Sequence, residues 1–327
     1  MRILVTGASG FIGKPICRRL VEMGHDVVAL SRKQPRKACL ESESIQMVCG
    51  DITSFSDVAA AMEQCDSCFH LAALAKPFSK HSSDFDRINV EGTRNILQSA
   101  IPAKLKRVVF TSTASVFGPS TLVHPTTEQS PVIRTANTAY ERSKIQCESV
   151  VHEFQAQSLD VVTVYPSRVF GPGPLHASNS FTHIIKLFLE NKWRFVPGNG
   201  TAIGNYVFID DVVDGHLRAM FRGKPNECYL LGGENLSFNQ IVEHLHSIVP
   251  NQQRMFHVPR SILRLLGSLQ LGSAKLFGTT PRITPAFVDK YLNNWCLDCE
   301  KAVHELDWRP TPFVDALKQT ISWLQAN

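Results

Sequence analysis

A glycine-rich loop directly after a short apolar run is the feature that most constrains how this chain can fold. The run Ile3–Thr6 leads into Gly7-Ala8-Ser9-Gly10-Phe11-Ile12-Gly13, and a helical pattern follows to about Met23. In such a loop the first glycine permits a tight turn, the second lets a pyrophosphate approach the backbone, and the third allows close helix–strand packing. The following helix N-terminus attracts negative charge. We therefore predict a dinucleotide-binding turn made by Gly7, Ser9, Gly10, Phe11, Ile12 and Gly13.

The rest of the first half repeats this alternation of apolar runs and helical patterns. Runs such as Val108-Val109-Phe110 are apolar on both faces, as expected where helices cover both sides of a parallel sheet. We therefore predict an α/β fold with a Rossmann-type doubly wound parallel sheet. The expected strands are Ile3–Thr6, Asp26–Leu30, Ile45–Cys49, Ser67–Leu71, Arg107–Ser112 and Asp160–Tyr165, and the expected helices are Phe11–Met23, Phe55–Gln64, Asp84–Ala100 and Ala139–Gln157.

After Pro166 the pattern loosens into glycine–proline connections and amphipathic helices, without a low-complexity linker or an internal repeat. We predict a Rossmann dinucleotide-binding domain over residues 1–170. Residues 171–327 are expected to form mainly a smaller C-terminal substrate-binding lobe. Some elements of this second region, such as residues 205–225, are expected to return to the Rossmann core.

Charge and hydropathy exclude several classes of protein. The 34 basic and 29 acidic residues are spread along the chain, for a net charge of +5, and no basic cluster is interleaved with aromatic residues. Nucleic acid is therefore not an expected partner. No apolar stretch reaches the roughly 18 residues of a membrane helix, and no signal peptide precedes the first strand. We expect a cytoplasmic protein without stable membrane insertion, and the sequence leaves a homodimer open.

The segment Val258–Gly278 is amphipathic, with several leucines beside Arg260, Arg264 and Lys275. It fits a helix that covers an apolar substrate cleft, which is the commoner case. It also fits a helix that lies on a membrane surface. Both alternatives stay open.

Nine cysteines, an odd number, are expected to be reduced thiols. Two Cys-x-x-Cys pairs, Cys65/Cys68 and Cys296/Cys299, are more than two hundred residues apart and lack the compact spacing of a zinc module. Cys68 also begins an apolar run in which a small buried thiol fits well. We therefore predict no metal site.

The end of the second expected strand bears on the choice of cofactor. A carboxylate there would accept hydrogen bonds from the adenosine ribose hydroxyls and would repel a 2′-phosphate. The chain instead has Leu30-Ser31-Arg32-Lys33, and a guanidinium can pair with that phosphate. Arg32 therefore favours NADP over NAD. The alternative is that Arg32 and Lys33 are ordinary solvated surface charges.

Tyr140 and Lys144 stand four residues apart in a helical pattern, so their side chains lie on one face. A nearby cation lowers the pKa of a phenol, which favours proton exchange near neutral pH. Alone, this spacing also arises on solvated helix faces. The catalytic interpretation is favoured by Thr111-Ser112-Thr113 at the end of the preceding strand, because enzymes with parallel sheets bind their ligands at strand ends.

Taken together, these positions resemble the extended short-chain dehydrogenase/reductase family, and the resemblance spans nearly the whole chain. It implies that Thr113 holds the substrate oxygen, that Tyr140 is the acid/base, and that Lys144 grips the nicotinamide ribose. The matching segments are Gly7–Gly13, Gly50–Ile52, His70–Ala73, Asn89–Asn95, Thr111–Gly118, Tyr140–Lys144, Tyr165–Gly173 and Asn205–Val212.

The same resemblance implies further cofactor contacts. Within the family, the chain looks most like dihydroflavonol 4-reductase-like proteins, which reduce a ketone with NADPH. Sugar-nucleotide epimerases usually carry an acidic residue at the end of the second strand and a tyrosine where Phe117 stands here. The implied contacts are Asp51 and Ile52 at the adenine, Leu71, Ala72 and Ala73 along the cofactor, and Pro166 and Val169 near the nicotinamide.

The resemblance implies an NADP(H)-dependent oxidoreductase that reduces a ketone or aldehyde to an alcohol by hydride transfer. The mostly apolar residues after Val169 favour a small, largely apolar substrate. Two alternatives stay open: a sugar-nucleotide epimerase or dehydratase that retains NAD, and a non-catalytic NADP-binding regulatory protein. Residues around Asn179, Phe181 and Asn205 and the Val258–Gly278 segment are expected to shape the substrate pocket. Asn179 and Asn205 are the expected substrate contacts besides Thr113.

Overall fold

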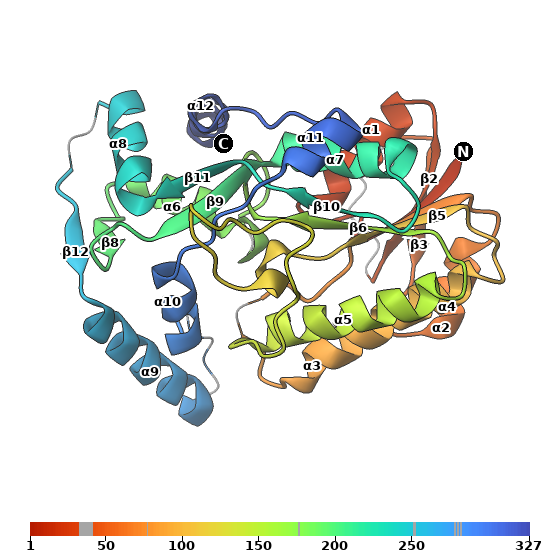
Figure 1. The fold of residues 1–327 in the computed structure, drawn as a ribbon, viewed down its shortest axis with the longest axis horizontal. Coiled ribbons are helices and arrows are strands. Elements are labelled where there is room, and N and C mark those ends of the chain that lie inside the picture. The colour runs from red at the N-terminus through yellow and green to blue at the C-terminus, as the bar shows by residue number, and fades with distance from the viewer. Residues whose placement is uncertain are drawn as a thin grey trace.

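The computed structural model describes residues 1–32, 42–76, 78–175, 177–250, 253–277, 279, 281 and 283–327. A seven-stranded parallel sheet forms its centre, in the order β10-β6-β5-β4-β1-β2-β3 (Figure 1). This confirms the predicted fold class. The strands of this sheet are β1 (Arg2–Thr6), β2 (Asp26–Ser31), β3 (Ile45–Cys49), β4 (Ser67–His70), β5 (Arg107–Thr111), β6 (Val161–Pro166) and β10 (Cys228–Leu231).

Helices cover both faces of the sheet because the strands are apolar on both faces. Successive residues of β1 therefore belong to different buried clusters. Ile3 and Val5 belong to the cluster on one face of the sheet, and Leu4 belongs to the cluster on the opposite face. In Figure 1, α2, α4 and α5 lie along one face, while α1 and α7 lie along the opposite face. These helices span α1 (Gly13–Glu22), α2 (Phe55–Met62), α4 (Gly92–Ala100), α5 (Ala139–Gln155) and α7 (Ile209–Arg222).

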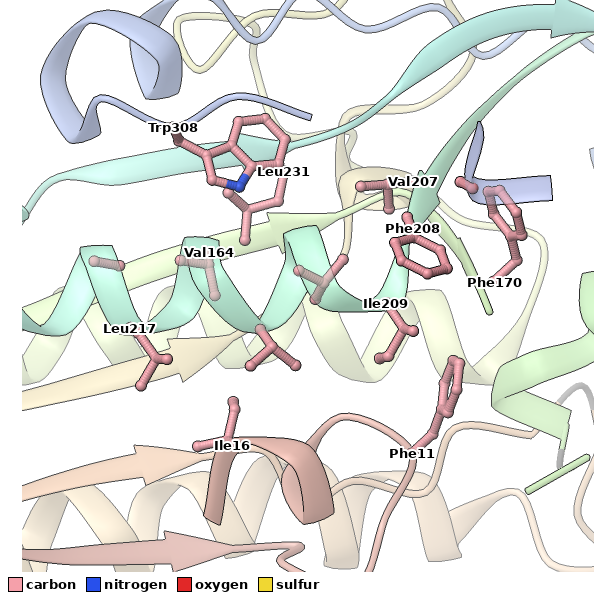
Figure 2. Packing of buried hydrophobic residues seen from close by; sticks show 14 of the residues in the cluster. Phe11, Ile16, Val164, Phe170, Val207, Phe208, Ile209, Leu217, Leu231 and Trp308 are labelled. Atoms are coloured by element: carbon pink, nitrogen blue, oxygen red, sulfur yellow. The ribbon is translucent and has the colours of Figure 1, made fainter. Parts of the chain in front are cut away.

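The core on the α1/α7 face is continuous with the C-terminal part of the chain. Figure 2 shows the side chains of Leu217 of α7 and Ile16 of α1 in the space between the two helices, and Val164 of β6 and Trp308 belong to the same cluster. The Trp308 indole is fully buried, and its Nε1 donates to the Asp211 carbonyl over 2.8 Å. The aromatic rings of Phe170 and Phe208 extend the same cluster away from the sheet.

Elements beyond residue 170 serve both the central sheet and the outer region. The strand β10 forms an edge of the main sheet, and α7 packs on β5 and β6. The strand β9 (Ile203–Phe208), just before α7, belongs instead to a separate three-stranded sheet with β7 (Arg168–Phe170) and β11 (Glu234–Ser237). The boundary at residue 170 between a dinucleotide-binding domain and a substrate-binding lobe therefore stays a prediction, because the chain returns to the main sheet after that residue.

The remaining elements pack around the central sheet and its flanking helices, with α11 against α7 and β10 and α3 against α5. A two-stranded parallel pair, β8 (Phe195–Pro197) and β12 (Phe256–Val258), lies at one edge of the molecule beside α9 and α10 (Figure 1). The other helices are α3 (Ser83–Phe85), α6 (Ser180–Leu189), α8 (Phe238–Ile248), α9 (Arg260–Phe277), α10 (Pro285–Leu292), α11 (Glu300–Leu306) and α12 (Phe313–Ala326), with 3₁₀ turns at Ala114–Phe117 and Ala177–Asn179.

One expected helix differs from its prediction. The stretch predicted as a single helix, Asp84–Ala100, contains a π-helical segment at Asp86–Glu91 before α4 begins. Within this segment Asn89 turns its side chain inward, where its Nδ2 donates to the Ser143 hydroxyl over 2.8 Å. Its Oδ1 accepts from the Leu74 backbone over 2.7 Å. These hydrogen bonds of Asn89 depend on tertiary packing. The helical periodicity of the sequence therefore does not predict the π-helical segment.

Candidate active site

The glycine loop after β1 adopts a turn that depends on its glycines. Gly7 has φ +70°, and a Cβ there would lie 2.9 Å from the Ala72 backbone nitrogen. A Cβ on Gly13 would lie 2.2 Å from the Gly7 carbonyl oxygen. The Gly10 N–H donates to that same oxygen over 2.8 Å, which closes the turn. The first and third glycines are therefore required by backbone contacts within the loop and with the end of β4.

A cleft of about 620 Å³ opens at the carboxyl ends of the parallel strands. Ligands of doubly wound sheets bind at this edge. The cleft has the glycine loop at one end and α10 at the other. The structure brings to its lining Thr113 and all sixteen positions predicted as cofactor contacts, namely Gly7, Ser9, Gly10, Phe11, Ile12, Gly13, Arg32, Asp51, Ile52, Leu71, Ala72, Ala73, Tyr140, Lys144, Pro166 and Val169.

These residues fit an elongated dinucleotide. The glycines leave backbone N–H groups and the start of α1 facing the cleft, where a pyrophosphate would be held. Next to the loop, the Asp51 carboxylate accepts hydrogen bonds from the Thr53 N–H over 2.9 Å and from its hydroxyl over 3.0 Å, which fixes the turn after β3. Arg32 lines the cleft at the end of β2, and Lys33 lies outside the described residues.

The predicted catalytic side chains meet in the middle of the cleft. The α5 helix begins at the N-cap Thr138, whose hydroxyl accepts from the Glu141 N–H over 3.1 Å, and it carries Tyr140 and Lys144. The Lys144 Nζ donates to the Thr111 carbonyl over 2.7 Å, at the end of β5. Thr113 follows two residues later and hydrogen-bonds Tyr140. Helix and strand end thus hold the three side chains together.

The charge state of Tyr140 differs from the sequence-based expectation. Burial raises the pKa of the phenol above its ordinary value, and the nearby Cys147 and Glu141 act in the same direction. The hydrogen bond with Thr113 opposes this shift without overcoming it. The expected lowering of the phenol pKa was wrong, because desolvation is the largest influence on this group. Burial also lowers the pKa of the Lys144 ammonium, whose Nζ donates to the Thr111 carbonyl. Tyr140 is therefore a protonated phenol at neutral pH.

Buried polar side chains behind the cleft hold β5 and α5 in place. Glu148 accepts hydrogen bonds from Ser112 and, over 2.7 Å, from the Tyr165 hydroxyl. Burial raises the pKa of the Glu148 carboxyl. Burial also lowers the pKa of His216, which hydrogen-bonds Thr111 over 2.9 Å, to about 4. The sequence analysis missed these groups, since nothing in their spacing distinguishes them from ordinary polar residues.

Asn179 and Asn205 do not line the cleft, contrary to the expectation that they contact substrate. Asn179 is fully buried, and its Nδ2 donates to the carbonyls of Gly171 and Pro174. Asn205 is also buried, and its Nδ2 donates to the Gly233 carbonyl over 2.8 Å. The Nδ2 groups of both residues donate to backbone carbonyls of connecting loops, so we do not retain the two asparagines as substrate contacts.

Other residues occupy the end of the cleft beyond the catalytic side chains. The Arg168 guanidinium lies over the Tyr291 ring, 4.5 Å from its centroid, and Nη1 donates to the Tyr206 hydroxyl over 2.9 Å. Lys290 of α10 forms an ion pair with Glu141 of α5 over 2.7 Å, which ties α10 across the cleft. Arg168 lies between the predicted Pro166 and Val169, so the matched segment could have indicated it. The sequence carried no signal for α10. The residues of this end are Arg168, Phe181, Thr284, Phe287, Lys290 and Tyr291.

The described cysteines are free thiols, and among the described residues no group of three or more histidine, cysteine or acidic side chains could hold a metal ion. Cys68 is fully buried in the sheet, and Cys299 accepts a hydrogen bond from the Gly232 N–H over 3.2 Å. Burial raises the pKa of the Cys299 thiol to about 12, so this thiol is not a ready ligand or nucleophile.

We expect purified protein, prepared without added metal, to carry no stoichiometric zinc and to have Cys65, Cys68, Cys296 and Cys299 reduced. Elemental analysis and intact-mass measurement under denaturing alkylation would check this. One zinc per chain, or a disulfide in either pair, would contradict it.

Within the described part of the chain, no helix combines the length and the apolar character needed to cross a bilayer.

A parallel doubly wound sheet with a glycine loop and a cleft at its carboxyl edge defines a dinucleotide-binding α/β protein. The sequence model of the NAD dependent epimerase/dehydratase family matches residues 3–232. The chain belongs to this family, and it is an NAD(P)-dependent enzyme of the extended short-chain dehydrogenase/reductase type. The resemblance seen in the sequence is confirmed.

Curated relatives and a solved structure match over nearly the whole chain. The "Putative dihydroflavonol 4-reductase" of Synechocystis sp. is 31% identical over 327 residues, covering 98% of this chain and 94% of the relative. The "Sterol demethylase protein B" of Methylococcus capsulatus is 28% identical over 331 residues, covering 99% and 98%. The crystal structure of gox2253 matches with a TM-score of 0.83 at 27% identity, covering 99% of this chain and 98% of that one.

Proposed function

We propose that this enzyme uses NADPH to reduce a ketone or aldehyde on a largely apolar substrate to the alcohol. The observation that carries the proposal is the grouping of Thr113, Tyr140 and Lys144 midway along the cleft, between the glycine loop and an aromatic end. The bound cofactor would supply the hydride to the carbonyl carbon.

The side chains of the chain supply the rest of the chemistry. The hydroxyls of Thr113 and Tyr140 would donate hydrogen bonds to the carbonyl oxygen and stabilise the negative charge that develops there. Tyr140 would then transfer its proton to that oxygen, which gives the alcohol. Tyr140 is a protonated phenol at neutral pH, so it carries the proton that reduction of the carbonyl requires. Lys144 would hold the nicotinamide ribose and keep a positive charge beside the phenol.

The character of the substrate follows from the far end of the cleft. Phe181, Phe287 and Tyr291 present aromatic surface there. This supports an aromatic, terpenoid-like or other apolar carbonyl compound more than a bare sugar. The names of two relatives agree with an apolar substrate, since they refer to a dihydroflavonol and a sterol.

Net consumption of NADPH tests the proposal. We expect purified protein to oxidise NADPH when supplied with apolar ketones, in proportion to the alcohol formed. An epimerase or dehydratase that retains NAD would convert sugar nucleotides without net cofactor consumption. A non-catalytic NADP-binding protein would bind NADPH and convert neither class of compound. Either of these two outcomes would contradict the proposed reduction.

Cofactor choice is expected to depend on Arg32. NADPH should bind at least tenfold more tightly than NADH, about 1.4 kcal/mol, because the guanidinium pairs with the 2′-phosphate. Arg32→Asp should reverse the order, which calorimetric titration with both cofactors would measure. Arg19→Asp makes the same charge change at an exposed position of α1 outside the cleft, so it should leave the order intact. Equal affinities in the wild type would show that Arg32 does not read the phosphate.

A further inference from the structure

One face of α9 presents a row of apolar side chains to solvent. The exposed fraction of Leu265 is 60% and that of Leu269 is 63%. Ile262 and Leu266 are exposed as well, and the spacing of these four residues places them on one side of the helix. Phe277, in the last turn, is 77% exposed. A contiguous apolar surface of this kind in a folded protein marks a binding surface.

The opposite side of α9 packs against α10, the helix that closes the cleft. At the crossing, a Cβ on Gly267 would lie 3.0 Å from the Pro285 backbone nitrogen, so the two helices are in close contact. Arg260 and Arg264 both reach Asp289 of α10, over 2.8 Å and 3.9 Å. The exposed row is therefore the outer surface of the wall that bounds the aromatic end of the cleft.

The strand pair that precedes α9 extends this apolar edge. Phe195 of β8 and Phe256 of β12 are register partners, and they are 57% and 54% exposed. Phenylalanine side chains paired in this way would ordinarily be covered. In Figure 1 the pair and α9 follow one another along the same edge of the molecule.

Basic side chains outnumber acidic ones along this edge. In the sequence, residues 244–288 include no aspartate or glutamate, and the basic residues Arg254, Arg260 and Arg264 of this stretch are exposed in the structure. Arg254 is exposed beside Phe256, and Lys192 and Arg194 are exposed beside Phe195. Asp289 is the acidic partner of Arg260 and Arg264, and Glu190 is that of Lys192, so the edge keeps a positive excess.

We propose that α9 and the β8/β12 pair dock on the surface of an anionic lipid bilayer. The apolar row would enter the boundary between headgroups and acyl chains, and the basic side chains would face anionic headgroups. A second copy of this chain is a poorer occupant, because a two-fold contact would set the same basic surface against itself. Docking here would place the aromatic end of the cleft one helix away from the lipid.

Sedimentation of the full-length protein with vesicles tests this proposal. The protein should co-sediment with phosphatidylcholine vesicles containing phosphatidylglycerol, less so with pure phosphatidylcholine, and less again as salt rises. A double variant, Leu265→Ser with Leu269→Ser, should lower the partition coefficient at least about tenfold, because two apolar side chains no longer leave water. Both leucines are exposed, so the thermal unfolding midpoint should stay near the wild-type value.

A matched control removes apolar surface elsewhere. Leu122→Ser with Val123→Ser changes two residues that are 60% and 80% exposed on the loop after β5, and partitioning should not change. Absence of co-sedimentation at low salt would overturn the proposal, as would equal losses in the two double variants. A wild-type dimer in light scattering that becomes monomeric in the α9 variant would assign the surface to a second copy and also overturn it.

Discussion

Tyr140→Phe should lower turnover of a reducible ketone by roughly 10²–10⁴, the usual contribution of a positioned acid/base. The substitution keeps the ring and its packing while it removes the hydroxyl that hydrogen-bonds Thr113 and would deliver the proton. Cofactor affinity should change little, because Lys144 keeps its hydrogen bond to the Thr111 carbonyl and stays in the cleft. Steady-state rates, together with NADPH titration of the same sample, would separate the two quantities.

Two neighbouring variants show whether the loss belongs to proton transfer. Thr113→Val should cost about 10²-fold in turnover, as for one lost donor to a developing oxyanion, without weakening cofactor binding. Lys144→Met should weaken both cofactor binding and turnover, because the ammonium serves the ribose and the charge around the phenol. Full activity in Tyr140→Phe with normal NADPH binding would make the tyrosine a bystander, and another proton donor in the cleft would be required.

The residues of the site that the sequence predicted all lie at strand ends or on one helix face, where the local sequence pattern determines where a side chain lies. In a parallel sheet, every strand ends at the same edge, so naming the ends of β1, β2, β4, β5 and β6 already names the wall of the cleft. The glycine loop, Arg32, Leu71 and Thr113 follow directly from those strand ends, and all of them line the cleft. Tyr140 and Lys144 needed only the helical period of α5 in addition.

The parts that the sequence did not predict depend on packing between distant segments. Asn179 and Asn205 are polar residues in the expected region, but both are buried away from the cleft, and their Nδ2 groups donate to backbone carbonyls of nearby loops. Lys290 and Tyr291 reach the cleft because α10 folds back across it and pairs with Glu141, 149 residues earlier. The spacing of residues along the sequence does not predict such a contact between α10 and α5.

The pKa of Tyr140 was also predicted wrongly because it depends on packing between distant segments. A spacing of four residues places the ammonium and the phenol on one helix face, and it says nothing of what else each group meets. In the folded chain, Lys144 lies under the Phe110 ring, 4.7 Å from the centroid, and its Nζ is held by the Thr111 carbonyl. Desolvation then dominates the pKa of both groups, which raises that of the phenol and lowers that of the ammonium.

Gly13→Ala should destabilise the fold and weaken cofactor binding together. The new Cβ would lie 2.2 Å from the Gly7 carbonyl oxygen and 2.8 Å from its carbonyl carbon, and both are backbone atoms of the glycine loop. Relief requires α1 to move away from the loop, which should lower the free energy of unfolding by about 1–3 kcal/mol, as for other overpacked sites. The same movement displaces the loop that would hold the pyrophosphate, so NADPH affinity should fall at least about tenfold.

Gly272→Ala supplies the matched control for this prediction. Gly272 lies in α9, and a Cβ there meets no atom within 4 Å, so the substitution should leave NADPH affinity unchanged and raise stability slightly through the higher helix propensity of alanine. Chemical denaturation and NADPH titration of the two variants would be compared side by side. If Gly13→Ala matched Gly272→Ala in both measurements, the contact between the glycine loop and α1 would not constrain the cofactor end of the cleft. The packing role of the third glycine would then have to be abandoned for this chain.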